Sequence, residues 1–229
     1  MNPFQQYLHS SIGKKQIVAV TGLVLILFVI GHLAGNLFMY GGPEAFNGYA
    51  KKLASFRPFL NFVEFGLLAI FVTHMYVTAL LVLENYQARG GKRYAAYKPV
   101  GQRSWATQLM PYTGTVVLAF VIWHLLDFTF VDHEGVRSIL PNGKHLGLYG
   151  IVYNAFLNPW HSVLYIFAMI AVGLHLAHGI QSFFQTFGFN HPKYTPIIQK
   201  ISNGLSTLIV LLYSSIPIYV LLDSVKSLH

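Results

Sequence analysis

The chain has 229 residues, of which 54% are hydrophobic and only 10% are charged, and it contains no cysteine. Soluble globular domains carry about 25% charged residues, so this composition excludes a soluble enzyme, a disordered chain and an ordinary nucleic-acid-binding protein, despite a net charge of +8. The lack of cysteine excludes disulfides, thiolate catalysis and iron–sulfur clusters bound by this chain. Any metal site would therefore depend on the 11 histidines.

Five apolar stretches are each long enough to span about 30 Å of hydrocarbon, which takes about 20 helical residues. In chain order they are residues 17–40, 59–83, 110–131, 160–187 and 201–222. Pro111 favours a helix start, Asn158-Pro159 precedes the fourth stretch, and Pro217 predicts a kink in the fifth. Because lipid does not tolerate unpaired backbone, the sequence predicts one all-α domain over residues 1–229, a five-helix transmembrane bundle.

Lysine and arginine in the loops predict how this bundle is oriented in the membrane. The side that holds the N-terminus carries nine of these residues, and the opposite side carries six. Cytoplasmic loops of membrane proteins are enriched in positive charge. We therefore expect a multi-pass protein of the cell inner (cytoplasmic) membrane, surrounded by lipid, with its N-terminus in the cytoplasm and its C-terminus outside.

Histidines lie deep in four of the five stretches, and ionisable residues inside a membrane are costly and usually functional. With a rise of about 1.5 Å per residue, His32 and His124 fall on the outer half of helices that run outward. His74 and His175 fall slightly to the inner half of helices that run inward. Two imidazoles from different helices at each of two heights match the axial ligation of two six-coordinate haems.

A fifth deep histidine, His178, competes with His175 for one role. Three residues apart, their side chains point about 60° away from each other on a helix, so both cannot face the same iron. Gly179 follows His175 by one turn and favours it, which leaves His178 as a hydrogen-bonding or packing residue, or as the ligand if the two roles are exchanged. Small residues that would admit a porphyrin edge are Gly31, Gly35, Gly173 and Gly179.

Four short motifs accompany these histidines: Ser11-Ile12-Gly13-Lys14-Lys15, Val20-Thr21-Gly22-Leu23, Gly31-His32-Leu33-Ala34-Gly35-Asn36 and His175-Leu176-Ala177-His178-Gly179. Together with the order and depth of the histidines, these motifs form a pattern that extends over nearly the whole chain. In these features the sequence resembles the di-haem cytochrome b subunit of succinate:quinone oxidoreductases. The resemblance is to the large single-anchor type, which occurs in succinate dehydrogenases and fumarate reductases that use menaquinone.

The resemblance implies two haems b, with His32 and His124 as axial ligands of the outer haem iron and with His74 and His175 as those of the inner one. It also implies a flavoprotein subunit and an iron–sulfur subunit on the cytoplasmic side, with menaquinone or another quinone as substrate. The chain would then be the membrane-anchor and electron-transfer subunit of a respiratory oxidoreductase complex of the tricarboxylic acid cycle. Succinate and fumarate would be interconverted on a partner chain.

The sequence departs from the family at Gly173, two residues before His175. Some fumarate reductases of this type carry a glutamate at this position, which has been proposed as part of a transmembrane proton path. Because glycine has no ionisable side chain, we expect no such path through the fourth stretch.

Quinone reduction requires protons, and Asp127 and Glu64 are the candidates for their transfer at an outer quinone site. Asp127 lies three residues after His124, and Glu64 lies near the outer end of the second stretch. The alternative is that both are interfacial residues that contact lipid headgroups. Further candidates near the outer site are Asn36, Trp160 and His161. Candidates for binding the propionates of the inner haem are Ser11, Lys15, Arg89, Arg103 and Gln181.

Two other functions remain open at this point. A quinol-oxidising cytochrome b of a nitrate reductase, formate dehydrogenase or hydrogenase would also have paired histidines, but it favours two ligands on one helix. A haem-free transporter with a histidine proton relay predicts internal repeats or broken helices. We find no clear repeat, and the glycine and proline breaks do not match between two halves.

Overall fold

The computed structural model describes residues 2–88 and 105–226. Within them, five helices are long and apolar enough to cross a membrane. These are α2 (Ser11–Asn36), α4 (Arg57–Ala88), α5 (Trp105–Phe128), α7 (Pro159–Thr186) and α8 (Thr195–Lys226). The described part of the chain has no β-strand. The predicted all-α fold with five spanning helices is thus confirmed.

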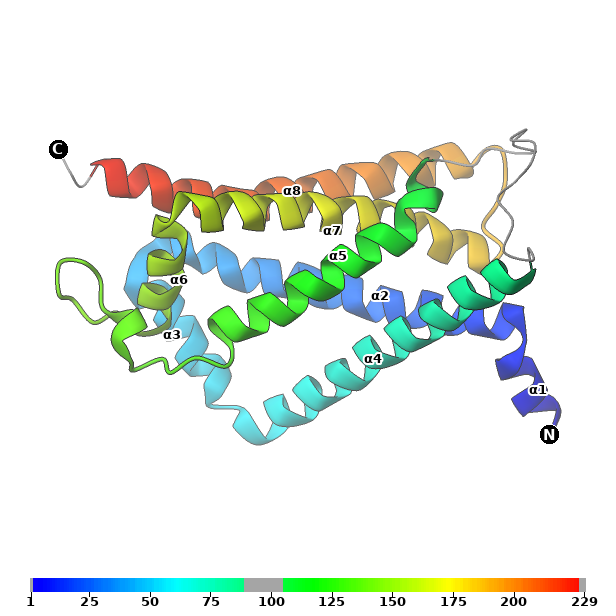
Figure 1. Cartoon of the computed structure of the whole chain (residues 1–229), viewed down its shortest axis with the longest axis horizontal. Coiled ribbons are helices and arrows are strands. Elements are labelled where there is room, and N and C mark those ends of the chain that lie inside the picture. Colours follow the sequence, from blue (N-terminus) through cyan, green and yellow to red (C-terminus); the bar gives the residue numbers. More distant parts are fainter. Residues whose placement is uncertain (1, 89–104, 227–229) are drawn as a thin grey trace.

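The short elements gather at the two ends of the long helices (Figure 1). At one end lie the N-terminus and α1 (Pro3–His9). At the other lie η1 (Leu37–Gly41), α3 (Gly42–Ala54), η2 (Val136–Ser138), α6 (Gly147–Leu157) and the C-terminal end of α8. We call these the inner end and the outer end. The first and last described segments, α1 and the C-terminal end of α8, therefore lie at opposite ends, as an odd number of crossings requires.

The helix boundaries follow local capping signals more closely than the edges of the apolar stretches. The side chain of Asn158 accepts the backbone N–H of the second residue of α7 at 3.0 Å, and Pro159 takes the first helical position. Ser10 caps α2 in the same way, so this helix begins six residues before its apolar stretch. Pro111 was expected at a helix start, and this was wrong: α5 begins at Trp105, and the proline lies inside it.

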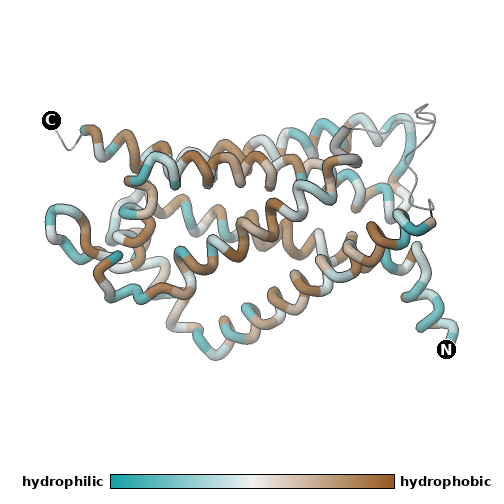
Figure 2. The backbone as a smooth tube through the Cα atoms, in the orientation of Figure 1, coloured by the Kyte–Doolittle hydropathy of each residue, from teal (hydrophilic) through white to brown (hydrophobic). Residues whose placement is uncertain are grey.

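Burial is unequal among the long helices. Helices α7 and α8 pack against each other and against α2 through a cluster formed by Leu33, Ala168, Met169, Val172, Leu176 and Ile209. Helix α4 packs mainly along α2 and is almost wholly exposed, with Phe62 76% exposed. An apolar band covers the middle of the long helices, and polar residues lie toward the ends (Figure 2). Such large exposed apolar faces are suited to hydrocarbon rather than water.

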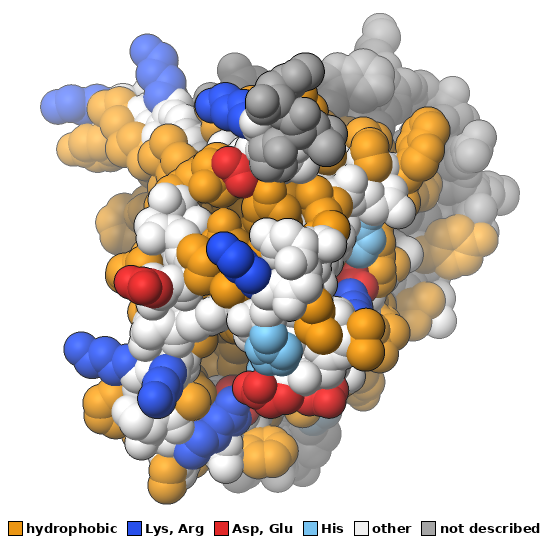
Figure 3. All heavy atoms as spheres, turned by 90° about the vertical axis from the view of Figure 1, so that its left-hand side faces the viewer, with side chains coloured by type: hydrophobic (Ala, Val, Ile, Leu, Met, Phe, Trp, Pro, Cys, Tyr) orange, Lys and Arg blue, Asp and Glu red, His pale blue; other side chains and the backbone are white. Residues whose placement is uncertain are grey.

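The outer end has its own core, which lies under α3 and α6. Met39, Phe46, Tyr149 and Phe156 belong to this cluster. Burial raises the pKa of Tyr149 to about 12, so its hydroxyl stays neutral at physiological pH. Outside this core, lysine, arginine and acidic side chains are interspersed with apolar ones on the surface of the outer end (Figure 3). The polar ring at this end is consistent with a membrane–water interface.

Two of the four glycines expected beside a porphyrin instead allow close packing of helices. A Cβ on Gly35 would lie 2.8 Å from the Tyr49 ring of α3, and a Cβ on Gly173 would lie 2.2 Å from Val210 Cγ2 of α8. Gly31 and Gly179 have no such neighbour within 4 Å in the described structure. A side chain at position 173 would therefore clash with the Val210 side chain as it stands, so a glutamate there would require Val210 to move or to be smaller.

We predict that Gly173→Ala destabilises the bundle, because the new methyl group forces α7 and α8 apart. Overpacking of this kind costs about 1–3 kcal/mol. Thermal unfolding of the detergent-purified protein should show a lower midpoint. Gly204→Ala on α8 is the matched control, since a Cβ there meets nothing within 4 Å. Equal midpoints for the two variants would contradict the predicted clash, whereas adding Val210→Ala to Gly173→Ala should restore stability.

Candidate haem-binding site

Two imidazoles face each other in the outer half of the bundle. The ring centres of His32 on α2 and His124 on α5 lie 5.8 Å apart, with an angle of 84° between the ring planes. An imidazole nitrogen binds a transition metal at about 2 Å, which places two rings on opposite sides of one metal roughly 6 Å apart. Phe28 stacks on His32 at 5.4 Å, and Phe120 lies 5.6 Å from His124. Both rings are thus held between aromatic residues at a separation suited to a shared metal.

Hydrogen bonding within the chain does not account for His124. Its Nδ1 atom is buried and has no hydrogen-bond partner in the described structure. Leaving a buried polar atom unpaired costs about 1–3 kcal/mol, and the simplest structural role for a membrane histidine is a bond to a neighbouring helix. That role is not seen at the Nδ1 atom of His124, so the closeness of its ring to His32 is the feature that favours a ligand-binding role.

A second pair lies in the inner half. His74 on α4 and His175 on α7 lie near each other. Each ring is bound through its Nδ1 by a threonine of another helix: Thr21 Oγ1 lies 3.0 Å from His74 Nδ1, and Thr113 Oγ1 lies 3.2 Å from His175 Nδ1. The inner rings are therefore fixed by hydrogen bonds, whereas the outer rings are fixed mainly by aromatic contacts.

The two pairs occupy two levels of the bundle. Thr21, which contacts the inner pair, precedes His32 by eleven residues on α2, and Thr113 precedes His124 by eleven residues on α5. At 1.5 Å per residue, eleven residues span about 16 Å. The levels are therefore separated by about half of the hydrocarbon thickness. The structure brings together the same partners that depth along the sequence had indicated.

His178 lies near this inner pair without a defined role. It lies three residues after His175 on α7. Its Nδ1 is buried and makes no hydrogen bond to any described residue, so His178 is not a simple hydrogen-bonding residue through this atom. His175 has both a threonine contact and a position near His74, and neither is seen for His178 in the described structure. These two features favour His175 as the inner ligand.

The donor set suits haem better than a metal ion bound by protein alone. In the described ranges no three histidine, cysteine, aspartate or glutamate side chains converge on one point. Haem iron needs only two protein ligands, because the porphyrin supplies the other four, and neutral imidazole is a common axial ligand. Each level offers two imidazoles from two helices, so the residues present fit two bis-histidine haems.

Acidic and hydrogen-bonding side chains lie next to the outer pair. Tyr165 Oη donates to Asp127 Oδ2 at 2.7 Å. His161 Nε2 lies 3.2 Å from the same oxygen, at an angle that makes no hydrogen bond, and Arg137 Nη2 lies 3.6 Å from Asp127 Oδ1. The Tyr165 ring centre is 6.3 Å from that of His124. We call Asp127, His161, Tyr165 and Arg137 the outer polar cluster. It places a carboxylate, a phenol and an imidazole beside the outer pair.

The other outer candidates lie apart from this cluster. Glu64 pairs with Arg57 on its own helix at 3.2 Å, and both side chains are more than half exposed. The Asn36 amide donates to the carbonyl of His32 at 2.8 Å, and Trp160 is 77% exposed. The geometry thus favours Asp127 over Glu64, and His161 over Trp160, as groups near the outer pair.

The candidates for propionate binding are spread over the inner end. Ser11 begins α2, and Lys15 is an exposed residue one turn later. Gln181 donates to Asn203 Oδ1 at 3.3 Å and so connects α7 with α8. Arg89 and Arg103 lie outside the described residues. No contact between these side chains and the inner imidazoles is seen where the structure describes them, so their role stays a prediction.

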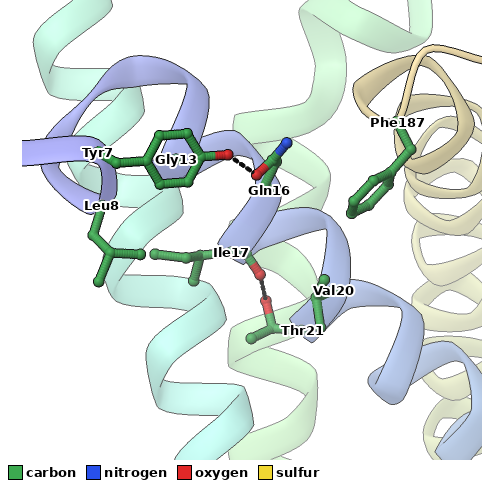
Figure 4. A pocket seen from close by; sticks show the side chains of 8 residues that line it. All are labelled: Tyr7, Leu8, Gly13, Gln16, Ile17, Val20, Thr21 and Phe187. Atoms are coloured by element: carbon green, nitrogen blue, oxygen red, sulfur yellow. Dashed lines mark hydrogen bonds between the residues drawn. The ribbon is translucent and has the colours of Figure 1, made fainter. Parts of the chain in front are cut away.

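An open groove of about 330 Å³ lies beside the inner level, where α1 and α2 meet the end of α7 (Figure 4). Its lining is mostly apolar and consists of Tyr7, Leu8, Gly13, Gln16, Ile17, Val20, Thr21 and Phe187. Tyr7 donates a hydrogen bond to Gln16 across one wall. Thr21 therefore lies between this groove and His74.

The threonines that bind the inner imidazoles are functional candidates that composition and depth did not reveal. Each is followed by a glycine, in Thr21-Gly22 and Thr113-Gly114, and each lies eleven residues before a histidine of the outer pair. This repeated spacing was a usable signal in the sequence. Its meaning required the structure, because the bound histidine lies on a different helix.

The fold and the arrangement of imidazoles define a class of multi-pass helical membrane protein with paired histidines at two depths. Among curated proteins, the chain is similar to the succinate dehydrogenase cytochrome b558 subunit of Bacillus subtilis (strain 168). The two are 26% identical over 196 residues, which cover 85% of this chain and 88% of that protein. No protein-family model matches the chain. No solved structure matches it either.

Proposed function

We propose that the chain is the membrane-anchor and electron-transfer subunit of a succinate:quinone oxidoreductase. The observation that carries this proposal is the pair of imidazole sites, one above the other, built from four different helices. The similarity to a succinate dehydrogenase cytochrome b558 subunit over most of both chains supports it. A quinol-oxidising cytochrome b of another respiratory complex favours two ligands on one helix and fits this distribution less well.

In this proposal His32 and His124 bind the outer haem, and His74 and His175 bind the inner one. A bis-imidazole haem, when bound, supplies one-electron redox chemistry without an open coordination position. The polypeptide holds the outer imidazoles through aromatic contacts and the inner ones through their threonines. Electrons would pass between an iron–sulfur subunit at the inner end, on the cytoplasmic side, and a quinone. The dicarboxylate chemistry belongs to a flavoprotein partner.

The outer polar cluster is the proposed source of protons for quinone reduction at the outer level. Tyr165 donates to Asp127, so a proton can be held between the phenol and the carboxylate. His161 Nε2 lies 3.2 Å from the same oxygen, close enough to take part in the transfer after a small rotation of its ring. Arg137 Nη2 faces the other carboxylate oxygen at 3.6 Å and positions it.

Two measurements on the purified protein test the proposed function. The reduced chain should show b-type absorption bands from two haems. A flavin-containing, succinate-oxidising partner should co-purify with it from its native membrane. A colourless chain would overturn the haem assignment, and a two-haem chain that brings down a different dehydrogenase would instead support the other class of cytochrome b.

We predict that Asp127→Asn slows succinate-dependent quinone reduction by the purified complex, because the amide keeps the shape of the carboxylate but cannot hold the proton. General acid–base groups typically contribute 10²–10⁴-fold, so a loss of roughly 10²-fold is expected. Both haems should remain bound, as judged by the reduced spectrum. Glu134→Gln, a change at a loop carboxylate that is 86% exposed, is the control. Normal turnover in Asp127→Asn would exclude Asp127 from the proton path.

A further inference from the structure

Helices α2 and α5 carry the same sequence pattern, so the expectation that the chain has no clear repeat was wrong. Aligning Thr21–Leu33 with Thr113–Leu125 places identical residues at the same offsets. The matched pairs are Thr21/Thr113, Gly22/Gly114, Val24/Val116, Phe28/Phe120, Val29/Val121, Ile30/Ile122, His32/His124 and Leu33/Leu125. Repeats also occur in transporters, but here the repeated residues surround the imidazoles.

The repeat extends from the sequence to the contacts. Helix α2 packs along α4, and α5 packs along α7. In each pair the first helix provides a histidine to the outer level, four residues after a phenylalanine that packs on its ring. The same helix contacts the inner histidine of the second helix through its Thr-Gly dipeptide. The two helix pairs are therefore built alike around the imidazoles.

The glycine of each dipeptide lies against the inner ring. A Cβ on Gly22 would lie 3.1 Å from His74 Cε1, and a Cβ on Gly114 would lie 3.4 Å from His175 Cε1. A side chain at position 22 would crowd its ring, and one at position 114 would just touch it. The ring edge thus packs on the glycine while its Nδ1 meets the neighbouring threonine.

The proton of each threonine hydroxyl is already engaged by its own helix. Thr21 Oγ1 lies 2.7 Å from the carbonyl oxygen of Ile17, a bond drawn in Figure 4. Thr113 Oγ1 lies 3.1 Å from the carbonyl oxygen of Leu109. A hydroxyl has one proton and two acceptor lone pairs, so a threonine that donates to a carbonyl can only accept from the imidazole. With the hydroxyl proton on its carbonyl, each inner ring carries its own proton on Nδ1, which leaves Nε2 unprotonated.

We propose that Thr21 and Thr113 are positioning residues, which fix His74 and His175 in the tautomer and ring orientation that present Nε2 to the inner haem iron. This inference rests on the proposed function and adds to it a specific role for the two Thr-Gly dipeptides. An acceptor on Nδ1–H orients a metal-binding histidine and makes it a stronger electron donor. A stronger donor favours the oxidised metal, so these hydroxyls hold the inner haem potential down.

Thr113 gives the sharper test, because the Val18 carbonyl is a second acceptor beside His74. Thr113→Val removes the acceptor and keeps the side-chain shape. Redox titration of the purified complex, followed in the visible spectrum, should show the inner haem potential shifted upward and the outer one unchanged. Thr113→Ser keeps the hydroxyl and should restore the original potential. If Thr113→Val instead loses the inner haem, Thr113→Ser should retain it.

Thr115→Val is the matched control. This exposed threonine lies two residues away on the same helix and bonds only to the Pro111 carbonyl, at 2.9 Å, among the described contacts. It should leave both potentials unchanged. Two results would overturn this inference and leave the proposed function intact. One is an unshifted inner haem potential in Thr113→Val with both haems bound. The other is loss of the inner haem in both Thr113→Val and Thr113→Ser. A haem-free wild-type chain would overturn both.

Discussion

Replacing His124 with alanine is expected to remove the outer haem and to leave the inner one bound. Alanine deletes one of the two imidazoles that lie 5.8 Å apart, and a bis-histidine haem without one axial ligand is poorly retained. The inner pair is held by its own threonine contacts on α2 and α5, about 16 Å away along the helices. The reduced spectrum of the purified variant, together with a redox titration, should show one haem where the wild type shows two.

The partner substitution makes this result specific. His32→Ala should remove the same haem as His124→Ala, whereas His74→Ala should remove the other one. His133→Ala is the control, because this exposed loop histidine contacts only the Phe128 carbonyl among the described residues. Two results for His124→Ala would contradict the pairing of His32 with His124. One is loss of neither haem, and the other is loss of both haems while His133→Ala folds normally.

The second large effect is expected at the inner level, where His175→Ala should remove the inner haem while His178→Ala retains it. His175 has the threonine contact and the proximity to His74, whereas His178 lies three residues further on, on a different part of the helix face. Haem content and the redox titration of both variants decide between them. An intact inner haem in His175→Ala, with loss in His178→Ala, would exchange the two assignments.

Much of the fold was predictable because the membrane imposes strong rules on sequence. Each long apolar stretch corresponds to one of the five helices, since lipid permits few other structures. The helix ends were less accurate because capping acts locally: Ser10 extends α2 beyond the apolar stretch, and α5 continues through Pro111. The outer core beneath α3 and α6 was not predicted, because both helices are too short to span a membrane and lie between the long apolar stretches.

The part of the candidate site that depends only on the depth of a residue along its helix was predictable from the sequence. The rise per residue sorted the four histidines into the two pairs that the structure brings together. Depth does not determine which residue of another helix faces each ring, so Thr21, Thr113 and Tyr165 were missed. For the same reason, Gly35 and Gly173 were assigned to a porphyrin, although they face Tyr49 and Val210.

The sparse packing of α4 has a consequence for how the protein matures. This helix carries His74 but packs mainly along α2, from which it diverges toward the outer end (Figure 1). Apolar surfaces gain little by leaving lipid for each other, and α4 has α2 as its one main neighbour in the described structure. A metal centre between His74 and His175 would tie α4 to α7, as ligand binding does when it completes a fold. Biogenesis would then be coupled to haem supply, and under haem limitation α4 would be the segment most open to membrane proteases.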